Sequence, residues 1–269
     1  MVPAVTRPPR LVATDMDGTV VHSDHTVSPY SHDVLRRVVA AGVPVVGVTG
    51  RGPRLRTVTA RDLPMARYVV CAQGAYVLDV VEDVALSIVH LPAEVARDAV
   101  KLLEDVVGPV LLTVETGEAA DAPLYGEAGF HWPFPEAWLE ATRDVSLRGE
   151  LLKVFVKKPG LDPDDFLAIA RRVVPPELCD VTYSGLGFLE ICPSGISKAV
   201  GLASVAERLG VEAADVLAFG DMPNDVPMLI WAGHGVAVAN AHVEVLAVAD
   251  EVTLSNDEDG VARYLADLF

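Results

Sequence analysis

The stretch Leu11-Val12-Ala13-Thr14-Asp15-Met16-Asp17-Gly18-Thr19 joins a short apolar run to acidic and turn-forming residues. An apolar run that stops at acidic residues is typical of a buried parallel strand that ends at a site. In an open parallel sheet, ligands bind beyond the carboxyl ends of the strands. The stretch therefore predicts an α/β fold in which Asp15 and Asp17 lie at that edge of the sheet.

Helices and strands alternate on both sides of a long middle segment. Residues 28–42 predict a helix, with Ser28 as its N-cap and Gly42 at its end. With the strands on either side, this helix would form one right-handed crossover unit. The pattern predicts a Rossmann-like core with a mainly parallel sheet, whose further strands are residues 43–48, 68–71, 216–219 and 235–238.

The middle of the chain has its own set of elements. Residues 93–107 and 163–174 have the spacing of helices, and residues 110–115 and 152–156 read as strands. Such a segment can bury a small core of its own. We therefore expect the core to comprise residues 1–88 and 189–269, and an inserted, smaller α/β cap domain to comprise residues 89–188.

The charge of the chain restricts its partners. With 269 residues, 51% apolar residues and a net charge of −17, it should fold and should repel nucleic acid and anionic membranes. A free phosphate ester would be repelled too, so a phosphate site must supply its own cations. Residues 1–10 lack an apolar signal core and no apolar run approaches the ~20 residues that span a bilayer, which favours a cytoplasmic protein. Nothing in the sequence predicts an oligomeric state.

Asp15 and Asp17 are suited to bind one metal ion. They lie two residues apart, so in an extended segment they point the same way. Ordinary turn chemistry after a strand is the alternative, since Asp and Gly are common there. A chance match to the four specified residues of Asp-x-Asp-Gly-Thr has a probability of about one in a thousand in a chain of this length. Turn chemistry alone is therefore a poor explanation.

Attack of a carboxylate on phosphorus requires nearby cations. At ~3.5 Å and an effective dielectric constant of ~20, each pair of negative charges costs about 5 kcal/mol. Mg²⁺ is the hard, oxygen-liganded cation that suits this role, with Asp15, Asp221 and the carbonyl of Asp17 as candidate ligands. Lys198 is a candidate second cation, although its position alone also fits a surface lysine.

Two further segments carry suitable groups. Thr49, with the amides of Gly50 and Arg51, offers donors for phosphate oxygens before a helix. The turn at residues 220–225 carries two acids and an amide, which suit a metal ion and the groups around it. An ordinary acidic helix N-terminus is the alternative for that turn.

These motifs together resemble a known family. In sequence order they are similar to the four motifs of the haloacid dehalogenase superfamily, in its Cof-type, sugar-phosphatase-like branch, over about the whole chain. The stretches 190–198 and 235–241 also resemble that branch. The four motifs are Asp15-Met16-Asp17-Gly18-Thr19, Thr49-Gly50-Arg51, Lys198 and Gly220-Asp221-Met222-Pro223-Asn224-Asp225.

The resemblance implies a Mg²⁺-dependent phosphatase that acts on a small phosphorylated metabolite. Asp15 would be the nucleophile, and Asp17 the acid and base. The implied metal site comprises Asp15, Asp17, Asp221 and Asp225, with Asp225 supporting both the metal and Lys198. The implied phosphate-binding residues are Gly18, Thr49, Gly50, Arg51, Lys198 and Asn224.

The resemblance also implies that the cap closes over the core, excludes water and selects the substrate. Gln73 stands where this branch often has Asn, so we expect its longer amide to lie near the substrate. Tyr125, His131, Trp132 and Trp138 of the cap are candidates for a pocket, and packing is the commoner role of such residues. His131 and Trp132 are the two that we carry forward as substrate contacts.

Three other functions stay open at this point. A phosphomutase would share the phospho-aspartate step and transfer the group to a second sugar hydroxyl. Carbon–halogen cleavage would need neither Asp17 nor a metal. A phosphate-binding regulatory module without turnover would keep the fold and the motifs, because neither proves activity.

Overall fold

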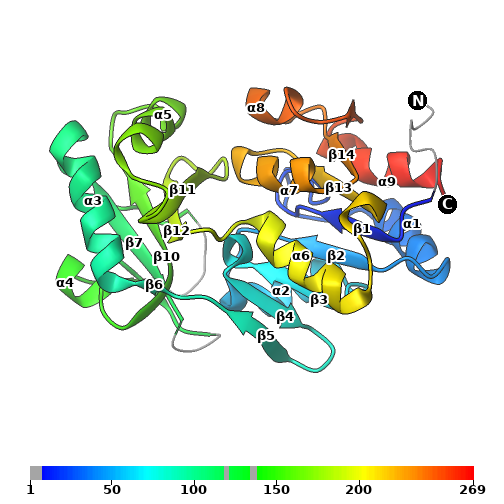
Figure 1. Ribbon diagram of the computed structural model, residues 1–269, viewed down its shortest axis with the longest axis horizontal. Coiled ribbons are helices and arrows are strands. Elements are labelled where there is room, and N and C mark those ends of the chain that lie inside the picture. The colour runs from blue at the N-terminus through cyan, green and yellow to red at the C-terminus, as the bar shows by residue number, and fades with distance from the viewer. Residues whose placement is uncertain (1–7, 118–120, 134–137) are drawn as a thin grey trace.

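The computed structural model describes residues 8–117, 121–133 and 138–269. Within these residues eight strands form the core sheet, in the order β15-β14-β13-β1-β2-β3-β4-β5 (Figure 1). Its strands are β1 (Leu11–Thr14), β2 (Val45–Val48), β3 (Tyr68–Cys71), β4 (Tyr76–Asp79), β5 (Val84–Ile88), β13 (Val216–Gly220), β14 (His234–Ala237) and β15 (Glu251–Val252).

The core sheet is mainly parallel, as the sequence predicts. Strand β1 pairs in parallel with β13 on one side and β2 on the other. Strand β4 pairs antiparallel with β3 and β5, and β4 and β5 form a hairpin at one edge. The carboxyl ends of β1, β2 and β13 therefore lie side by side, and the polar residues that follow them meet.

Helices cover both faces of the core sheet (Figure 1). Alternate residues of β1 point to opposite faces: Val12 packs with α1 (Pro29–Ala40) and α9 (Gly260–Ala266), whereas Leu11 and Ala13 pack with α6 (Lys198–Leu209) and α7 (Val226–Trp231). Both faces of the strand are apolar because both are buried. The predicted N-cap of α1 is confirmed, since the Ser28 hydroxyl accepts from the Ser31 amide at 2.9 Å.

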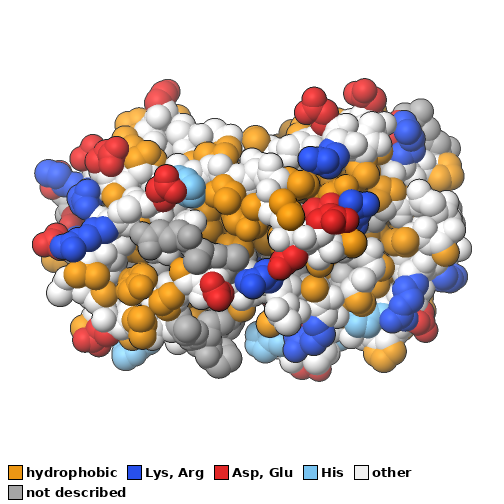
Figure 2. Space-filling view, turned by 90° about the horizontal axis from the view of Figure 1, so that it is seen from below, with side chains coloured by type: hydrophobic (Ala, Val, Ile, Leu, Met, Phe, Trp, Pro, Cys, Tyr) orange, Lys and Arg blue, Asp and Glu red, His pale blue; other side chains and the backbone are white. Residues whose placement is uncertain are grey.

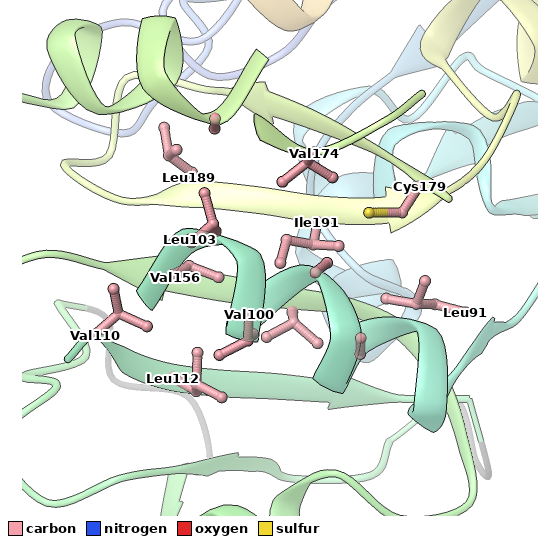
Figure 3. Close-up of a cluster of buried hydrophobic side chains, with 14 of the residues drawn as sticks. Leu91, Val100, Leu103, Val110, Leu112, Val156, Val174, Cys179, Leu189 and Ile191 are labelled. Carbon is pink, nitrogen blue, oxygen red and sulfur yellow. The ribbon is translucent and has the colours of Figure 1, made fainter. Parts of the chain in front are cut away.

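The cap has a second, mixed sheet with helices on one face. Figure 3 shows the apolar side chains that α3 (Ala93–Val107) packs against this sheet, among them Val100 and Leu103. Helix α5 (Pro163–Val173) packs on the same face. The cap strands are β6 (Leu91–Pro92), β7 (Leu111–Thr116), β8 (Leu124–Gly126), β9 (Trp138–Glu140), β10 (Glu150–Lys157), β11 (Cys179–Tyr183) and β12 (Leu189–Pro193).

The cap sheet extends beyond the expected division after residue 188. Strand β12 pairs antiparallel with both β10 and β11, so residues 189–193 belong to the cap sheet and not to the core sheet. The physical reason is that β12 buries its apolar side chains in the cap. Leu189 and Ile191 are buried in the apolar cluster under α3 and α5, and Glu190 points the other way.

The remaining elements are short. The sequence predicts a helix over residues 242–249, but α8 spans only Val243–Leu246. Strands β8 and β9 were not expected, because each has three residues. None of the helices in the described residues is long and apolar enough to cross a membrane. The other helical segments are α2 (Arg56–Asp62), α4 (Arg143–Ser146), η1 (Pro53–Leu55), η2 (Ala72–Gly74), η3 (Ala213–Asp215), η4 (Pro223–Asp225) and η5 (Asn256–Glu258).

Candidate active site

Asp15 and Lys198 meet at the carboxyl end of β1. The Asp15 amide donates to the Phe219 carbonyl of β13 at 2.9 Å, which fixes the backbone where the strand ends. Lys198 begins α6, and its ammonium donates to Asp15 and, at 2.6 Å, to Asp225 Oδ1. With 1% of its side chain exposed, Lys198 is not the surface lysine that its position alone allows.

Contacts with Asp221 explain why Gly18 and Thr19 follow Asp17 in the first motif. The Thr19 hydroxyl donates to Asp221 Oδ1 at 2.9 Å. Gly18 has a φ of 84°, and a Cβ there would lie 2.5 Å from Asp221 Oδ2. Only glycine allows this backbone conformation and this close approach together. Thr19 and Asp221 lie 202 positions apart in the sequence, and their hydrogen bond holds the first and last motifs in contact.

Asp225 orders the turn that carries Asp221. Its Oδ2 accepts the amides of Asp221 and Met222, each at 3.0 Å, while its Oδ1 accepts from Lys198. The Asp225 side chain is fully buried. Every part of its carboxylate is therefore used to position the turn and the lysine.

Three buried carboxylates lie together around one ammonium group. Asp15, Asp221 and Asp225 each present an oxygen within 4.8 Å of the others. Burial raises the pKa of Asp15 to about 7, against the opposing effect of Lys198. Burial, with Asp15 and Asp225 nearby, also raises the pKa of Asp221 well above its usual range. Negative charge is in excess here, and hard oxygen ligands at this spacing fit a divalent cation such as Mg²⁺.

The Asp17 carboxylate is paired with Arg51. Arg51 donates from Nη2 and Nε to the two Asp17 oxygens, at 2.6 and 2.8 Å, and from Nη1 to Asp62 at 2.7 Å. Burial alone would lower the pKa of Arg51, but the two carboxylates raise it. The Asp17 side chain is 47% exposed and is not among the three clustered carboxylates. The sequence pattern indicated the amide of Arg51 and not this guanidinium contact.

Thr49 and Gly50 follow β2, as expected, and Gln73 lies beside them. The Arg51 amide donates to the Thr49 hydroxyl at 3.0 Å. A Cβ on Gly50 would lie 2.7 Å from Gln73 Nε2, so glycine leaves room for that amide. Asn224 Nδ2 donates to Gln73 Oε1 at 3.0 Å. The structure therefore brings the Gln73 amide into contact with Asn224, one of the predicted phosphate-binding residues.

A cavity of about 480 Å³ lies between the acidic and phosphate-binding residues of the core and the cap. Figure 2 shows hydrophobic side chains gathered between the cap at the left and the core at the right. The groups that line the core side include Asp15, Asp17, Thr49, Gly50, Arg51, Arg54, Leu55, Val58, Asp221 and Asn224, and those that line the cap side include Trp132, Lys153, Phe155, Ser184, Leu186 and Glu190.

Of the cap residues named from the sequence, Trp132 lines the cavity. His131 is exposed, and neither it nor Tyr125 or Trp138 is among the lining residues that the structure describes. Trp138 instead packs at the aromatic cluster of the cap and donates to Thr113 at 3.2 Å. Gln73 is also absent from that lining, because its amide is used within the protein.

Sequence reasoning missed the charged residues of the cap wall. Lys153 of β10 donates to the Gly50 carbonyl and, at 2.6 Å, to Glu190 Oε2. Arg54 of the core pairs with Glu115 of β7. A signal was present in β10, where Lys153 interrupts an otherwise apolar strand and would have to be paired if buried. Its partners, however, come from distant segments.

Comparison with known proteins decides the family. Residues 12–265 match the haloacid dehalogenase-like hydrolases. The chain belongs to this family. The chain is also 30% identical over 97% of its length to a Bacillus subtilis protein named 5-amino-6-(5-phospho-D-ribitylamino)uracil phosphatase YitU, with 98% of that protein covered. A second relative from Bacillus subtilis, the putative phosphatase YxeH, is 30% identical over 96% of this chain and 98% of that protein.

Two solved structures share the fold. A Streptococcus mutans protein, SMU.1108c, superposes with a TM-score of 0.82 at 21% identity, covering 97% of this chain and 98% of that one. The subclass IIB sugar phosphatase BT4131 superposes with a TM-score of 0.80 at 19% identity, covering 96% and 98%. Family and relatives together identify the chain as a haloacid dehalogenase-type phosphatase with a Rossmann-like core and a cap.

Proposed function

We propose that the chain is a Mg²⁺-dependent phosphatase that hydrolyses a small phosphate monoester through an aspartyl-phosphate on Asp15. The observation that carries the proposal is the position of Asp15, which lies at the end of β1, contacts Lys198 and faces the cavity. The names of the relatives support a small phosphorylated metabolite as the substrate.

The buried acidic cluster supports Mg²⁺ as the cofactor. Asp15 and Asp221 would hold it with the Asp17 carbonyl, and Asp225 would support it through the turn and Lys198. Asn224 Oδ1 is buried and lacks a hydrogen-bond partner among the described residues, so it is a further oxygen for the cation or a bound hydroxyl. When bound, Mg²⁺ neutralises charge on the phosphoryl oxygens and on Asp15.

Asp15 acts as the nucleophile. Lys198 holds Asp15 Oδ1, so we assign Oδ2 to the attack on phosphorus. The Oδ2–P bond forms as the ester P–O bond breaks, and the leaving alcohol takes a proton. Lys198, the Thr49 hydroxyl and the backbone amides of Gly50 and Arg51 would stabilise the transferred phosphoryl group.

Asp17 supplies and removes the protons. It protonates the leaving alcohol, then accepts a proton from the water that attacks the aspartyl-phosphate, which releases phosphate and restores Asp15. Arg51 donates to both oxygens of the Asp17 carboxylate and so fixes its position beside the site. A bound phosphoryl group would compete with Asp17 for the Arg51 guanidinium.

The cap completes the site. We propose that the segment from residue 89 through β12 forms the cap, closes over the phosphoryl group, excludes water and selects the alcohol. Lys153 supports this role, because it reaches from the cap to the carbonyl of Gly50, beside Thr49. Closure of the cap would therefore act directly on the loop that carries Thr49 and Gly50.

Hydrolysis of p-nitrophenyl phosphate with and without Mg²⁺ tests the proposal. We expect Mg²⁺-dependent release of phosphate that Asp15→Asn abolishes and that the matched surface variant Asp33→Asn retains. Full activity of Asp15→Asn would overturn the mechanism. Activity that a chelator does not reduce would favour metal-free chemistry, and transfer to a second sugar hydroxyl would favour a mutase. Tight binding of a phosphorylated metabolite without release would indicate a silent binding module.

A further inference from the structure

The cavity wall beyond the catalytic groups is apolar. Leu55 and Val58 line it from η1 and α2 of the core, and Trp132, Phe155 and Leu186 line it from the cap. Phe155 lies on the face of the cap sheet opposite α3 and α5, which is the face turned to the core. The volume of about 480 Å³ is in the usual range for small-ligand pockets and leaves room for more than a phosphoryl group.

The charged groups of the cap wall are already paired with one another. Lys153, 2% exposed, donates to Gly50 and Glu190. The Glu190 carboxylate also accepts from Gln73 at 2.9 Å and from Ser184 at 2.5 Å. These contacts use the hydrogen-bonding capacity of the pair, so little of it is left for a ligand.

Two arginines of the core wall also lie beside carboxylates. Arg54 pairs with Glu115, and Arg61 pairs with Asp62, which also accepts from Arg51. Arg54 Nε lacks a hydrogen-bond partner among the described residues, but it is shielded from solvent and offers no donor to the cavity. Hydroxyl groups of a sugar pressed against the apolar part of this wall would lose water without gaining partners.

On this basis we propose that the site selects phosphate monoesters whose alcohol carries an apolar ring, and that Trp132 and Leu186 determine this specificity. The inference rests on the proposed phosphatase function and names its substrate class. The wall behind the ring is aromatic, because Trp132 stacks with Phe188 at a centroid distance of 5.6 Å and an interplanar angle of 23°. Leu186, 41% exposed, would cover the outer edge of the ring.

Three phosphate monoesters of primary alcohols test the inference. Benzyl phosphate and 3-phenylpropyl phosphate carry a ring at two distances from a primary ester oxygen, and glucose 6-phosphate is a primary ester without an apolar ring. We expect kcat/KM for the better ring ester to exceed that for glucose 6-phosphate about 10-fold, the scale at which apolar pockets discriminate.

Two variants and a matched control assign the effect to the wall. Trp132→Leu should lower kcat/KM for the ring ester about fivefold and change that for glucose 6-phosphate less than about twofold. Trp138→Leu removes a tryptophan from the same aromatic cluster but not from the cavity lining, so it should change neither. Leu186→Ser gives a second test at an exposed position where folding is not at risk, and should act as Trp132→Leu does.

The outcomes separate this inference from the function on which it rests. Hydrolysis of all three esters with equal or reversed preference would overturn the ring specificity and leave the phosphatase intact. A parallel fall in kcat/KM for the ring ester and for glucose 6-phosphate, in both Trp132→Leu and Leu186→Ser, would also overturn the ring specificity. Failure to hydrolyse any ester, p-nitrophenyl phosphate included, would instead overturn the proposed function.

Discussion

Two buried lysines of this molecule lie among carboxylates, and their surroundings differ in charge balance. Lys198 of the core has Asp15 and Asp225 as partners, with Asp221 nearby. Lys153 of the cap pairs with Glu190 at 2.6 Å and has Glu115 at 4.0 Å. The first cluster has three carboxylates for one cation.

The second cluster is balanced. Arg54 pairs with Glu115, so the cap cluster has two cations, Arg54 and Lys153, for two carboxylates, Glu115 and Glu190. Buried charges are tolerated when they are paired and hydrogen-bonded, and an excess of one sign needs a further partner. The core cluster thus carries an excess of negative charge that a cation would offset, whereas the cap cluster is balanced and joins cap to core.

Removal of each lysine should separate the two clusters by activity. We expect Lys198→Met to lower kcat about 10³-fold, because the cation that holds Asp15 and the phosphoryl group is lost. Lys153→Met should lower kcat less than about 10-fold, since Lys153 contacts the carbonyl of Gly50 and not the nucleophile. Steady-state hydrolysis of p-nitrophenyl phosphate measures both, and equal losses would erase the distinction.

The free energy of unfolding gives a second test, in which Lys153 and Glu190 of the cap are replaced singly and together. Lys153→Met leaves Glu190 buried without its ammonium partner and should lower the free energy of unfolding by about 3 kcal/mol. The double variant Lys153→Met/Glu190→Gln should recover at least half of that loss. Urea denaturation of the single and double variants gives the values, and a double variant no more stable than Lys153→Met would contradict a self-supporting pair.

The excess charge of the core cluster should appear as a pH dependence of the metal-free protein. Since burial raises the pKa of Asp15 from 3.8 to about 7, the folded state binds more protons than the unfolded state between these values. Stability then falls as pH rises through this window. We expect a loss of about 2 kcal/mol between about pH 5.5 and about pH 7.5, measured by denaturation with a chelator.

Two controls accompany the pH measurement. Asp15→Asn removes one of the titrating groups and should reduce the dependence, and Mg²⁺ should do the same by favouring ionised Asp15. A rise in stability over this range in the metal-free protein would contradict the excess of negative charge.

The smallest effect is expected where the two clusters join. Gln73 connects them, since its amide donates to Glu190 and accepts from Asn224. Gln73→Asn suits the backbone, whose φ is 61°, but the shorter amide reaches only one partner, so stability should fall by about 1 kcal/mol. Activity should change less than about threefold. A loss of activity above about 10-fold would instead place Gln73 in contact with the substrate.

Local sequence patterns predicted the core well. The run that ends at Asp15 and the turn at residues 220–225 predict strand ends and acids, and parallel pairing brings them together. The cap was harder, because β12 continues directly toward α6 and its alternation does not reveal which sheet it joins. The pairs Arg51 with Asp17 and Lys153 with Gly50 link residues 34 and 103 positions apart, and no local signal specifies such contacts.

The proposed mechanism depends most directly on a covalent phosphoryl group at Asp15. In Asp17→Asn the enzyme should still be phosphorylated by p-nitrophenyl phosphate, whose leaving group needs no proton, but should not release phosphate. We predict a burst of about one equivalent of p-nitrophenolate without turnover, and the mass of one phosphoryl group on the peptide that carries Asp15. Continued turnover without a burst, or a phosphoryl group on another residue, would contradict the account.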